Sequence, residues 1–236
     1  MINDIPGNVP DESYDIDFDT AMMLAVYVHD AQGFIKSGHG YYDVEREVQI
    51  FDNSSMVKKY VLGLEPMPDI SDEQKTRAGE IVEFFRNHIV TKKLMGTMSD
   101  FENTVLTAIA QGTQVYSYIG VIASLPNSYR VSKHRQEMED WFYDYRSKSE
   151  YIGTVKEQLR LTVMVKDVKY IQTHGIHLVT CYTDDDNIVK FFFNKNPDIS
   201  GLIKDRRLII TGKVKMHEVS SFSKCKETVL NYIKFH

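Results

Sequence analysis

The C-terminal third of the chain places aromatic rings and a lysine at alternating positions. We expect residues 176–194 to form a hairpin that turns at Asp185. Tyr182, Lys190 and Phe192 then lie on one face of it. Nucleic-acid-binding barrels use aromatic rings to stack on bases and lysines to bind phosphates. The alternative is that these rings pack under a helical part of the chain, because an antiparallel sheet often has one face covered in that way.

The residue pairing of this hairpin follows from its turn. On the first face Tyr182 pairs with Ile188, Thr180 with Lys190 and Leu178 with Phe192; on the other, Cys181 pairs with Val189, Val179 with Phe191 and His177 with Phe193. The second set is mostly apolar, so we expect that face to point into the core.

A row of cations follows further along the chain. Lys213 and Lys215 alternate with apolar residues, so both point outward from one strand. Clustered cations bind a phosphate backbone because they release its condensed counterions. The alternative is a solvated edge strand, where lysine prevents aggregation. Other cations lie near in the chain: Arg206, Arg207, Lys224, Lys226 and Lys234. The candidate nucleic-acid-binding residues are Tyr182, Lys190, Phe192, Arg207, Lys213, Lys215 and Tyr232.

The sequence contains no convincing catalytic or metal site. His174 and His177 with Cys181 have superficial ligand spacing, but a closed zinc site needs four ligands. The adjacent aspartates at 184–186 point in different directions on a turn, which favours solvation over a metal cluster. Phosphate-loop, dinucleotide and nucleophile-elbow motifs are absent. Cys181 and Cys225 sit in or beside expected strands, where cysteine is usually a small buried hydrophobe. We therefore expect no enzyme activity, no metal and no cofactor.

The elements that must position these residues change character near residue 150. From Leu159 to Val165 apolar residues recur at every second position, the pattern of a strand. The phase then slips, and Val168 and Tyr170 continue on even numbers. One slip predicts a bulge, which lets a long strand serve two sides of a barrel.

The order of the expected strands is that of an OB barrel. The first strand is the longest, a tight hairpin joins the second and third, and an insert without strand character separates the third from the fourth. The later strands are expected at 176–183, 187–194, 207–216 and 226–235. The predicted fold class is α+β: a helical N-terminal domain over residues 1–148, followed by a five-stranded OB-like antiparallel β-barrel over residues 149–236.

Residues 1–148 show mainly helical periodicity. Ser71 and Ser99 occupy N-cap positions, and Gln74 completes a capping box with Ser71. Gly96 is a helix stop. The expected helical runs cover residues 17–34, 42–62, 72–95, 101–111 and 131–148.

Charge is distributed unevenly between the two parts. Residues 1–148 contain 14 Lys and Arg and 23 Asp and Glu, a balance of −9, whereas residues 149–236 contain 14 and 10, a balance of +4. The two parts are therefore expected to have different partners. The acidic start, residues 1–16, is expected to be a disordered, solvating leader or a tail that competes for a basic groove. Two cysteines and the lack of a signal peptide or membrane-spanning run predict a cytoplasmic protein.

Segments of the C-terminal part resemble a known barrel domain. They are the entry at 151–157, the apolar strand at 159–165, the aspartate turn before the aromatic strand 189–193, and the endings 212–217 and 226–230. This pattern resembles a barrel domain of proteins encoded by large tailed bacteriophages, most of them of unassigned function. The resemblance covers about the last 85 residues. It implies a viral origin and a context in DNA metabolism, and it transfers no catalytic residue.

These observations lead to two functional hypotheses. The first is a single-stranded DNA or RNA-binding protein that acts in phage replication, recombination or transcription, in the cytoplasm of the infected host cell. The second is a protein-interaction module that docks onto a host or viral enzyme, such as a replication or transcription protein, and regulates it without catalysis. A strand binder requires Tyr182, Lys190, Phe192 and Lys213 to be exposed on one face. An interaction module predicts that face covered and an apolar patch exposed on the helices. A virion or tail component is a third possibility.

Overall fold

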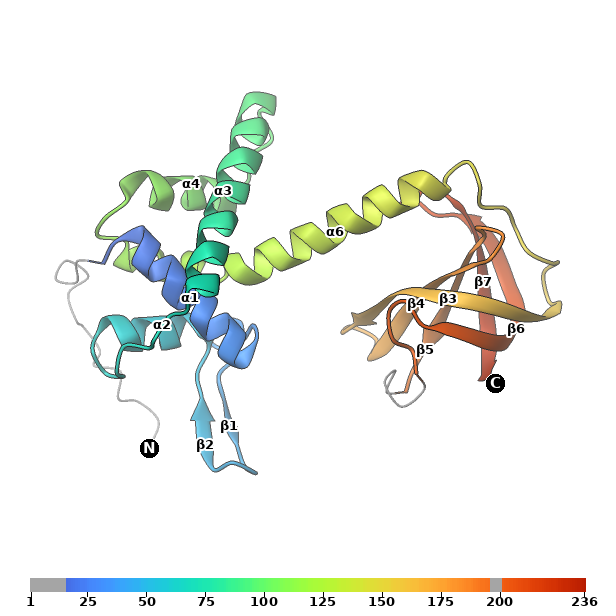
Figure 1. Ribbon diagram of the computed structural model, residues 1–236, viewed down its shortest axis with the longest axis horizontal. Helices are drawn as coiled ribbons and strands as arrows, with labels where there is room; N and C mark the ends of the chain where they lie inside the picture. The colour runs from blue at the N-terminus through green and yellow to red at the C-terminus, as the bar shows by residue number, and fades with distance from the viewer. Residues whose placement is uncertain (1–15, 196–200) are drawn as a thin grey trace. The chain divides into compact units, whose positions relative to one another are not determined.

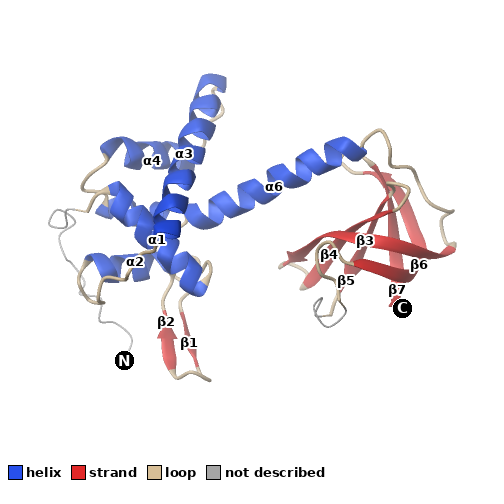
Figure 2. Ribbon diagram, viewed as in Figure 1, coloured by secondary structure: helices blue, strands red, loops and turns tan. Residues whose placement is uncertain are grey.

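The computed structural model describes residues 16–195 and 201–236 and divides the chain into two compact units. The first ends at Lys133 and is mainly helical, and the second, His134–His236, holds a closed five-stranded β-barrel (Figure 1). The expected α+β class, with helices before a barrel, is confirmed (Figure 2). The division between the units falls earlier than residue 148, because helix α6 (Leu125–Tyr145) continues from the first unit into the second. Apart from Ile16, the leader expected at residues 1–16 lies outside the described residues.

Helix α1 (Phe18–Gln32) is the centre of the helical unit. Its side chains Met22, Leu24 and Ala25 have no exposed surface. A helix that is apolar on most sides is stable only when other elements surround it. Here the surrounding elements are α2 (Asn53–Val61), α3 (Asp72–Met95), α4 (Asp100–Gln111) and α5 (Ile119–Ile122), the last preceded by the 3₁₀ turn η1 (Tyr116–Tyr118). Within the described ranges no helix is long and apolar enough to cross a membrane.

The helix boundaries that the sequence predicts from capping residues are confirmed. The Ser71 hydroxyl accepts a hydrogen bond from the backbone N–H of Gln74, and the Gln74 side chain accepts one from the backbone N–H of Ser71. Gly96 ends α3 in the left-handed conformation, with φ of 68°. Ser99 begins α4 with a second capping box, which it shares with Glu102.

The helical run expected over residues 42–62 is wrong in its first half. These residues form a hairpin of β1 (Tyr41–Asp43) and β2 (Val48–Ile50), and only α2 is helical. The Asp43 carboxylate accepts hydrogen bonds from the backbone N–H groups of Glu45 and Arg46, and Glu47 has a φ of 55°. These local bonds favour a turn over the apolar periodicity.

The barrel consists of β3 (Gln158–Ile171), β4 (Ile176–Thr183), β5 (Ile188–Phe193), β6 (Arg207–Val219) and β7 (Lys226–Phe235). The strands close in the order β3-β4-β5-β7-β6, which is consistent with an OB-like barrel. The expectation of a purely antiparallel barrel is wrong, because β5 and β7 run parallel. A closed ring with an odd number of strands cannot alternate in direction all the way round, so one parallel pair is unavoidable.

The register of the β4–β5 hairpin is the one that the sequence predicts. Its six pairs run from His177–Phe193 to Tyr182–Ile188. The expected inward face forms the barrel core, since Val179, Cys181 and Phe191 have no exposed surface. The predicted bulge is also present, as a register shift between Val165 and Asp167 where β3 passes along β4.

Glu102 joins the start of α4 to the end of α3. Its side chain is 8% exposed, and its Oε1 lies 2.5 Å from Nζ of Lys92. The hydroxyl and the backbone N–H of Ser99 donate to Oε2 at 2.8 and 2.9 Å. Burial by itself raises the pKa of Glu102, but these hydrogen bonds outweigh burial and bring the pKa down from 4.5 to about 2.

The stability contributed by Glu102 is therefore complete above its unfolded pKa and is lost as the pH falls toward 2. We expect Glu102→Gln to lower the free energy of unfolding by about 1–2 kcal/mol at pH 7, and by progressively less between pH 5 and pH 3. Urea denaturation across this range measures the difference. Glu73→Gln, at an exposed carboxylate in the first turn of α3, is the matched control. If the loss of unfolding free energy in Glu102→Gln did not change with pH, the stabilising role of the ionised Glu102 carboxylate would be contradicted.

Candidate nucleic-acid interface

Helix α6 covers one end of the outer face of β4 and β5. The centroid of the Tyr182 ring lies 5.7 Å from the centroids of both Trp141 and Tyr145. Ile188, on the same face, is fully buried in a cluster with Phe142. At this end the Tyr182 ring of the hairpin packs under a helix, which agrees with the alternative that the rings of this face are covered by helical structure.

Lys190 lies under the same helix, and its expected exposure is wrong. Its Nζ is 2.8 and 2.7 Å from the two carboxylate oxygens of Glu227, which has no exposed surface. The same ammonium group lies 5.1 Å from the centroid of the Phe142 ring. The helix excludes solvent from the site, and a buried ammonium group requires a carboxylate partner. Lys190 therefore has no free charge to offer a phosphate.

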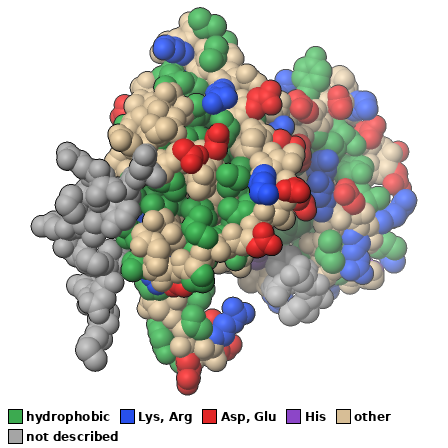
Figure 3. All heavy atoms as spheres, turned by 60° about the vertical axis from the view of Figure 1, so that its left-hand side comes forward, with side chains coloured by type: hydrophobic (Ala, Val, Ile, Leu, Met, Phe, Trp, Pro, Cys, Tyr) green, Lys and Arg blue, Asp and Glu red, His purple; other side chains and the backbone are tan. Residues whose placement is uncertain are grey.

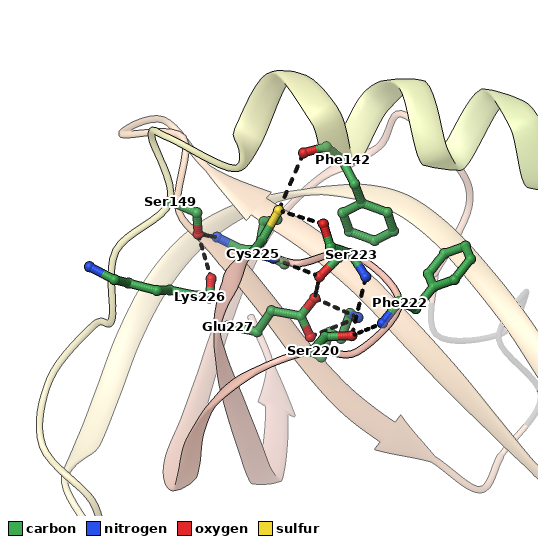
Figure 4. A network of polar contacts seen from close by, with 10 residues as sticks. Phe142, Ser149, Ser220, Phe222, Ser223, Cys225, Lys226 and Glu227 are labelled. Carbon is green, nitrogen blue, oxygen red and sulfur yellow. Dashed lines mark hydrogen bonds and ion pairs between the residues drawn. The ribbon is translucent and has the colours of Figure 1, made fainter.

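A network of polar contacts fixes α6 to the barrel (Figure 4). The Ser223 hydroxyl donates to Glu227 and accepts a hydrogen bond from the backbone N–H of Cys225 at 3.1 Å. The Cys225 thiol donates to the backbone carbonyl of Phe142 on α6 at 3.3 Å. Burial raises the pKa of the Cys225 thiol. Burial also raises the pKa of the Cys181 thiol, to about 12. Both thiols are therefore protonated at neutral pH, which is unsuitable for nucleophilic chemistry.

The other end of β5 and β7 is open. Phe191 and Leu230 are the last pair in the parallel ladder, and both side chains point into the core. Phe192 and Asn231 follow this pair, and the alternation of side chains places both on the outer face of the barrel. Phe192 is 49% exposed. The side-chain oxygen of Asn231 is buried and has no hydrogen-bond partner among the described residues.

Three cations lie on the outward positions of the neighbouring strands. Lys213 on β6 pairs with Asn231 on β7. Thr211, two residues before Lys213 on β6, pairs with Lys234 on β7 and with Arg160 on β3. Arg160, Lys213 and Lys234 are all exposed. In the part of the chain that the structure describes, none of the three forms an ion pair.

Tyr232 occupies a backbone conformation that tyrosine rarely adopts. It lies in β7 between Asn231 and Lys234, where the pairing with β6 shifts register. Its φ is 54°, and its side chain is 79% exposed. A left-handed conformation costs a residue with a side chain about 1–2 kcal/mol. The ring buries too little surface for core packing to offset that cost. A strained and exposed ring is a reason to look for a function at that position.

Five exposed residues lie on four adjacent strands of the barrel. We call Arg160, Phe192, Lys213, Tyr232 and Lys234 the open basic face. It lies on the four adjacent strands β5, β7, β6 and β3, in that order. The carboxylates of these strands lie elsewhere on them: Glu227 pairs with Lys190 under α6, Asp167 on β3 pairs with His134, and Glu218 lies further along β6. The arrangement can offer two rings to bases and three uncompensated positive charges to phosphates.

The seven residues that the sequence nominates therefore divide into groups. Phe192, Lys213 and Tyr232 come together in the open basic face, and Lys215 is exposed further along β6. Arg207 lies at the other end of β6, where its guanidinium group is 2.5 Å from a carboxylate oxygen of Asp184. Tyr182 and Lys190 lie under α6.

Arg160 is a member of the face that the sequence analysis missed. The two-residue repeat of β3 does place it outward, because Leu159 and Leu161 point inward. Its position opposite Thr211, which pairs with Lys234 on its other side, depends on how β3 and β6 close the barrel, and no local pattern reports that register. Across residues 16–195 and 201–236, no group of three His, Cys, Asp or Glu side chains is placed to hold a metal ion.

The buried pair under α6 gives a prediction about stability. We expect Lys190→Met to lower the free energy of unfolding by about 3–5 kcal/mol, because it leaves the Glu227 carboxylate buried without a counter-charge. Lys190→Met combined with Glu227→Gln should recover most of that loss, since Gln carries no charge and still accepts a hydrogen bond from Ser223. Chemical denaturation measures both. Equal losses in the single and double variants would contradict the assignment.

Comparisons of the chain with protein-family models, with curated proteins and with solved structures find no significant match.

Proposed function

We propose that this protein binds single-stranded nucleic acid through the open basic face of its barrel. The observation that carries the proposal is that two exposed rings, Phe192 and Tyr232, lie on the same or adjacent strands as exposed cations that form no ion pair with a described residue. A row of uncompensated cations binds a phosphate backbone, and exposed rings stack on bases with about 1–3 kcal/mol per base. The binding surface in this proposal includes only the Phe192 end of the β4–β5 face that OB domains use most often, because α6 covers the other end, over Tyr182 and Ile188.

The biological context of the proposal comes from the sequence. The resemblance of the last 85 or so residues to barrel domains of tailed bacteriophages supports a viral protein that acts in replication, recombination or transcription. The balance of −9 in residues 1–148 repels nucleic acid and confines the attraction to the barrel. No catalytic step is part of the proposal.

A second candidate function is supported by the surface of the helical unit. At the end of α3, Leu94 is 85% exposed, Met95 70% and Val90 54%. The hairpin residues Tyr41 and Tyr42 are also more than half exposed. Figure 3 shows hydrophobic side chains on the surface over the helical unit. Together with the partly covered β4–β5 face, these residues support an interaction module that docks onto another protein.

The first prediction concerns the cations. In a fluorescence-anisotropy titration of a labelled single-stranded oligonucleotide, Lys213→Ala should weaken binding by the intact chain. It should also reduce the slope of log affinity against log salt by about 0.7, because one phosphate contact is lost. Lys224→Ala removes an exposed charge from the turn between β6 and β7 and should leave both quantities unchanged. An absence of saturable binding at low salt would refute the proposal.

The second prediction concerns Tyr232. Tyr232→Gly should weaken strand binding by roughly 5- to 150-fold, because one stacking ring is lost. The same change should leave the free energy of unfolding at or above its original value, because glycine relieves the strain at φ of 54°. Tyr232→Phe keeps the ring and should keep the affinity. Unchanged affinity in Tyr232→Gly would remove this residue from the binding surface.

The third prediction tests the interaction module. Leu94→Ser combined with Met95→Ser should leave the melting temperature nearly unchanged, because both side chains are already in water. If the helical unit docks onto another protein, the unchanged chain should retain that protein at stoichiometric yield in a pull-down. The variant should not retain it. Arg86→Ser, on an exposed position of the same helix, is the matched control. Equal retention by both variants would contradict a docking role for this patch.

A further inference from the structure

An arginine that follows the last turn of α6 is held in place from two sides. The Nε of Arg146 donates to the backbone carbonyl of Ser223 at 3.1 Å, and its guanidinium carbon lies 5.4 Å from the centroid of the Tyr143 ring. Both contacts restrict a side chain that otherwise has many rotamers. Arg146 is exposed and forms no ion pair with a described carboxylate. Its terminal nitrogens therefore keep their N–H donors for a ligand, in a group whose position is already fixed.

The turn between β6 and β7 places an aromatic ring beside this arginine. Phe222 directly precedes Ser223, and its side chain is 44% exposed. Its ring meets the ring of Phe142 edge-on, with the two centroids 5.8 Å apart. The Ser220 hydroxyl accepts hydrogen bonds from the backbone N–H groups of Phe222 and Ser223 at 3.2 and 3.4 Å (Figure 4). The exposed ring is therefore carried by a hydrogen-bonded turn.

Tyr143 completes a surface with the composition of a protein–protein contact. Its side chain is 69% exposed on α6. Aromatic rings and arginine carry much of the binding energy in such contacts. Side chains that are fixed before binding also lose less conformational entropy when a partner arrives. We call Tyr143, Arg146 and Phe222 the arginine surface. It lies at the start of β7, whereas Tyr232 of the open basic face lies near the end of that strand.

The charges beside the arginine surface favour a protein ligand over a nucleic-acid strand. Asp140 and Asp144, on the same stretch of α6, are exposed and form no ion pair with a described residue. Two free carboxylates repel a chain of phosphates. A single carboxylate needs only the guanidinium fork, which can bind it through two parallel hydrogen bonds. The exposed rings suit an apolar side chain next to that carboxylate.

We propose that the arginine surface binds a protein segment in which an Asp or Glu lies next to an aromatic or aliphatic residue. Arg146 binds the carboxylate, and Tyr143 and Phe222 contact the apolar neighbour. The site is independent of strand binding, because none of its three residues belongs to the open basic face.

Selection of a display library of random short peptides on the intact chain tests the proposal. We expect the enriched peptides to share an acidic residue beside an aromatic or aliphatic one. In fluorescence anisotropy, a labelled selected peptide should bind Arg146→Gln at least tenfold more weakly, because charge-assisted hydrogen bonds are lost. Arg146→Lys should recover little of this loss, since an ammonium group has no planar fork. Arg160→Gln, at an exposed cation on β3, is the matched control and should leave peptide affinity unchanged.

A change in the peptide separates recognition from an effect on the fold. A peptide whose acidic residue is replaced by the corresponding amide should bind the unchanged chain at least tenfold more weakly. The same replacement should cause no further loss with Arg146→Gln, because the two changes remove one interaction. Phe222→Ser should weaken binding of both peptides by the same factor. Thermal unfolding establishes that each variant is folded before its affinity is interpreted.

Several results would overturn the site. They are enriched peptides without acidic residues, acidic peptides that depend on Arg160 and not on Arg146, and the absence of any enriched peptide. A single-stranded oligonucleotide that displaces the peptide and binds Arg146→Gln more weakly would assign the surface to nucleic acid instead of protein. The peptide assays do not involve Lys213, so failure of this site and failure of strand binding are distinguishable.

Discussion

Closure of the barrel is the constraint on which the rest of this unit depends. Five strands cannot alternate in direction around a closed ring, and the parallel pair falls between β5 and β7. That pairing places β7 between β5, which carries Phe192, and β6, where Lys213 pairs with Asn231 of β7. The same closure joins β6 to β3 and adds Arg160. Closure of the ring therefore brings residues that are distant in the sequence onto adjacent strands.

Helix α6 divides the outside of the barrel into a covered part and an open part. It packs aromatic side chains over Tyr182 and Ile188 and encloses the Lys190–Glu227 ion pair. Charges buried in this way are paired and add little net stability, but removing either partner is costly. The covered part is therefore structural. Cations such as Lys213 and Lys234, which form no ion pair with a described carboxylate, keep their full charge for a ligand.

Each unit exposes a different candidate contact surface. The helical unit exposes neighbouring apolar residues at the end of α3, such as Leu94 and Met95, and the barrel exposes cations that form no ion pair with a described residue. Apolar patches favour protein partners and rows of cations favour phosphates. A protein that binds a strand with one unit and a partner with the other would join the two functional hypotheses, and the charge balances of −9 and +4 over residues 1–148 and 149–236 agree with that separation.

Local patterns in the sequence determined much of the fold. The turn at Asp185 set the register of the β4–β5 hairpin, the phase slip located the bulge beside Val165, and N-cap serines located the starts of α3 and α4. These features depend on neighbours in the chain. The hairpin at Tyr41–Ile50 was missed because hydrogen bonds of Asp43 outweighed the apolar period. Only the tertiary structure decided which outward residues stay exposed, since Lys190 and Lys213 have the same alternating pattern. A helix covers one and not the other, and the position of that helix depends on packing between distant segments, which no local spacing encodes.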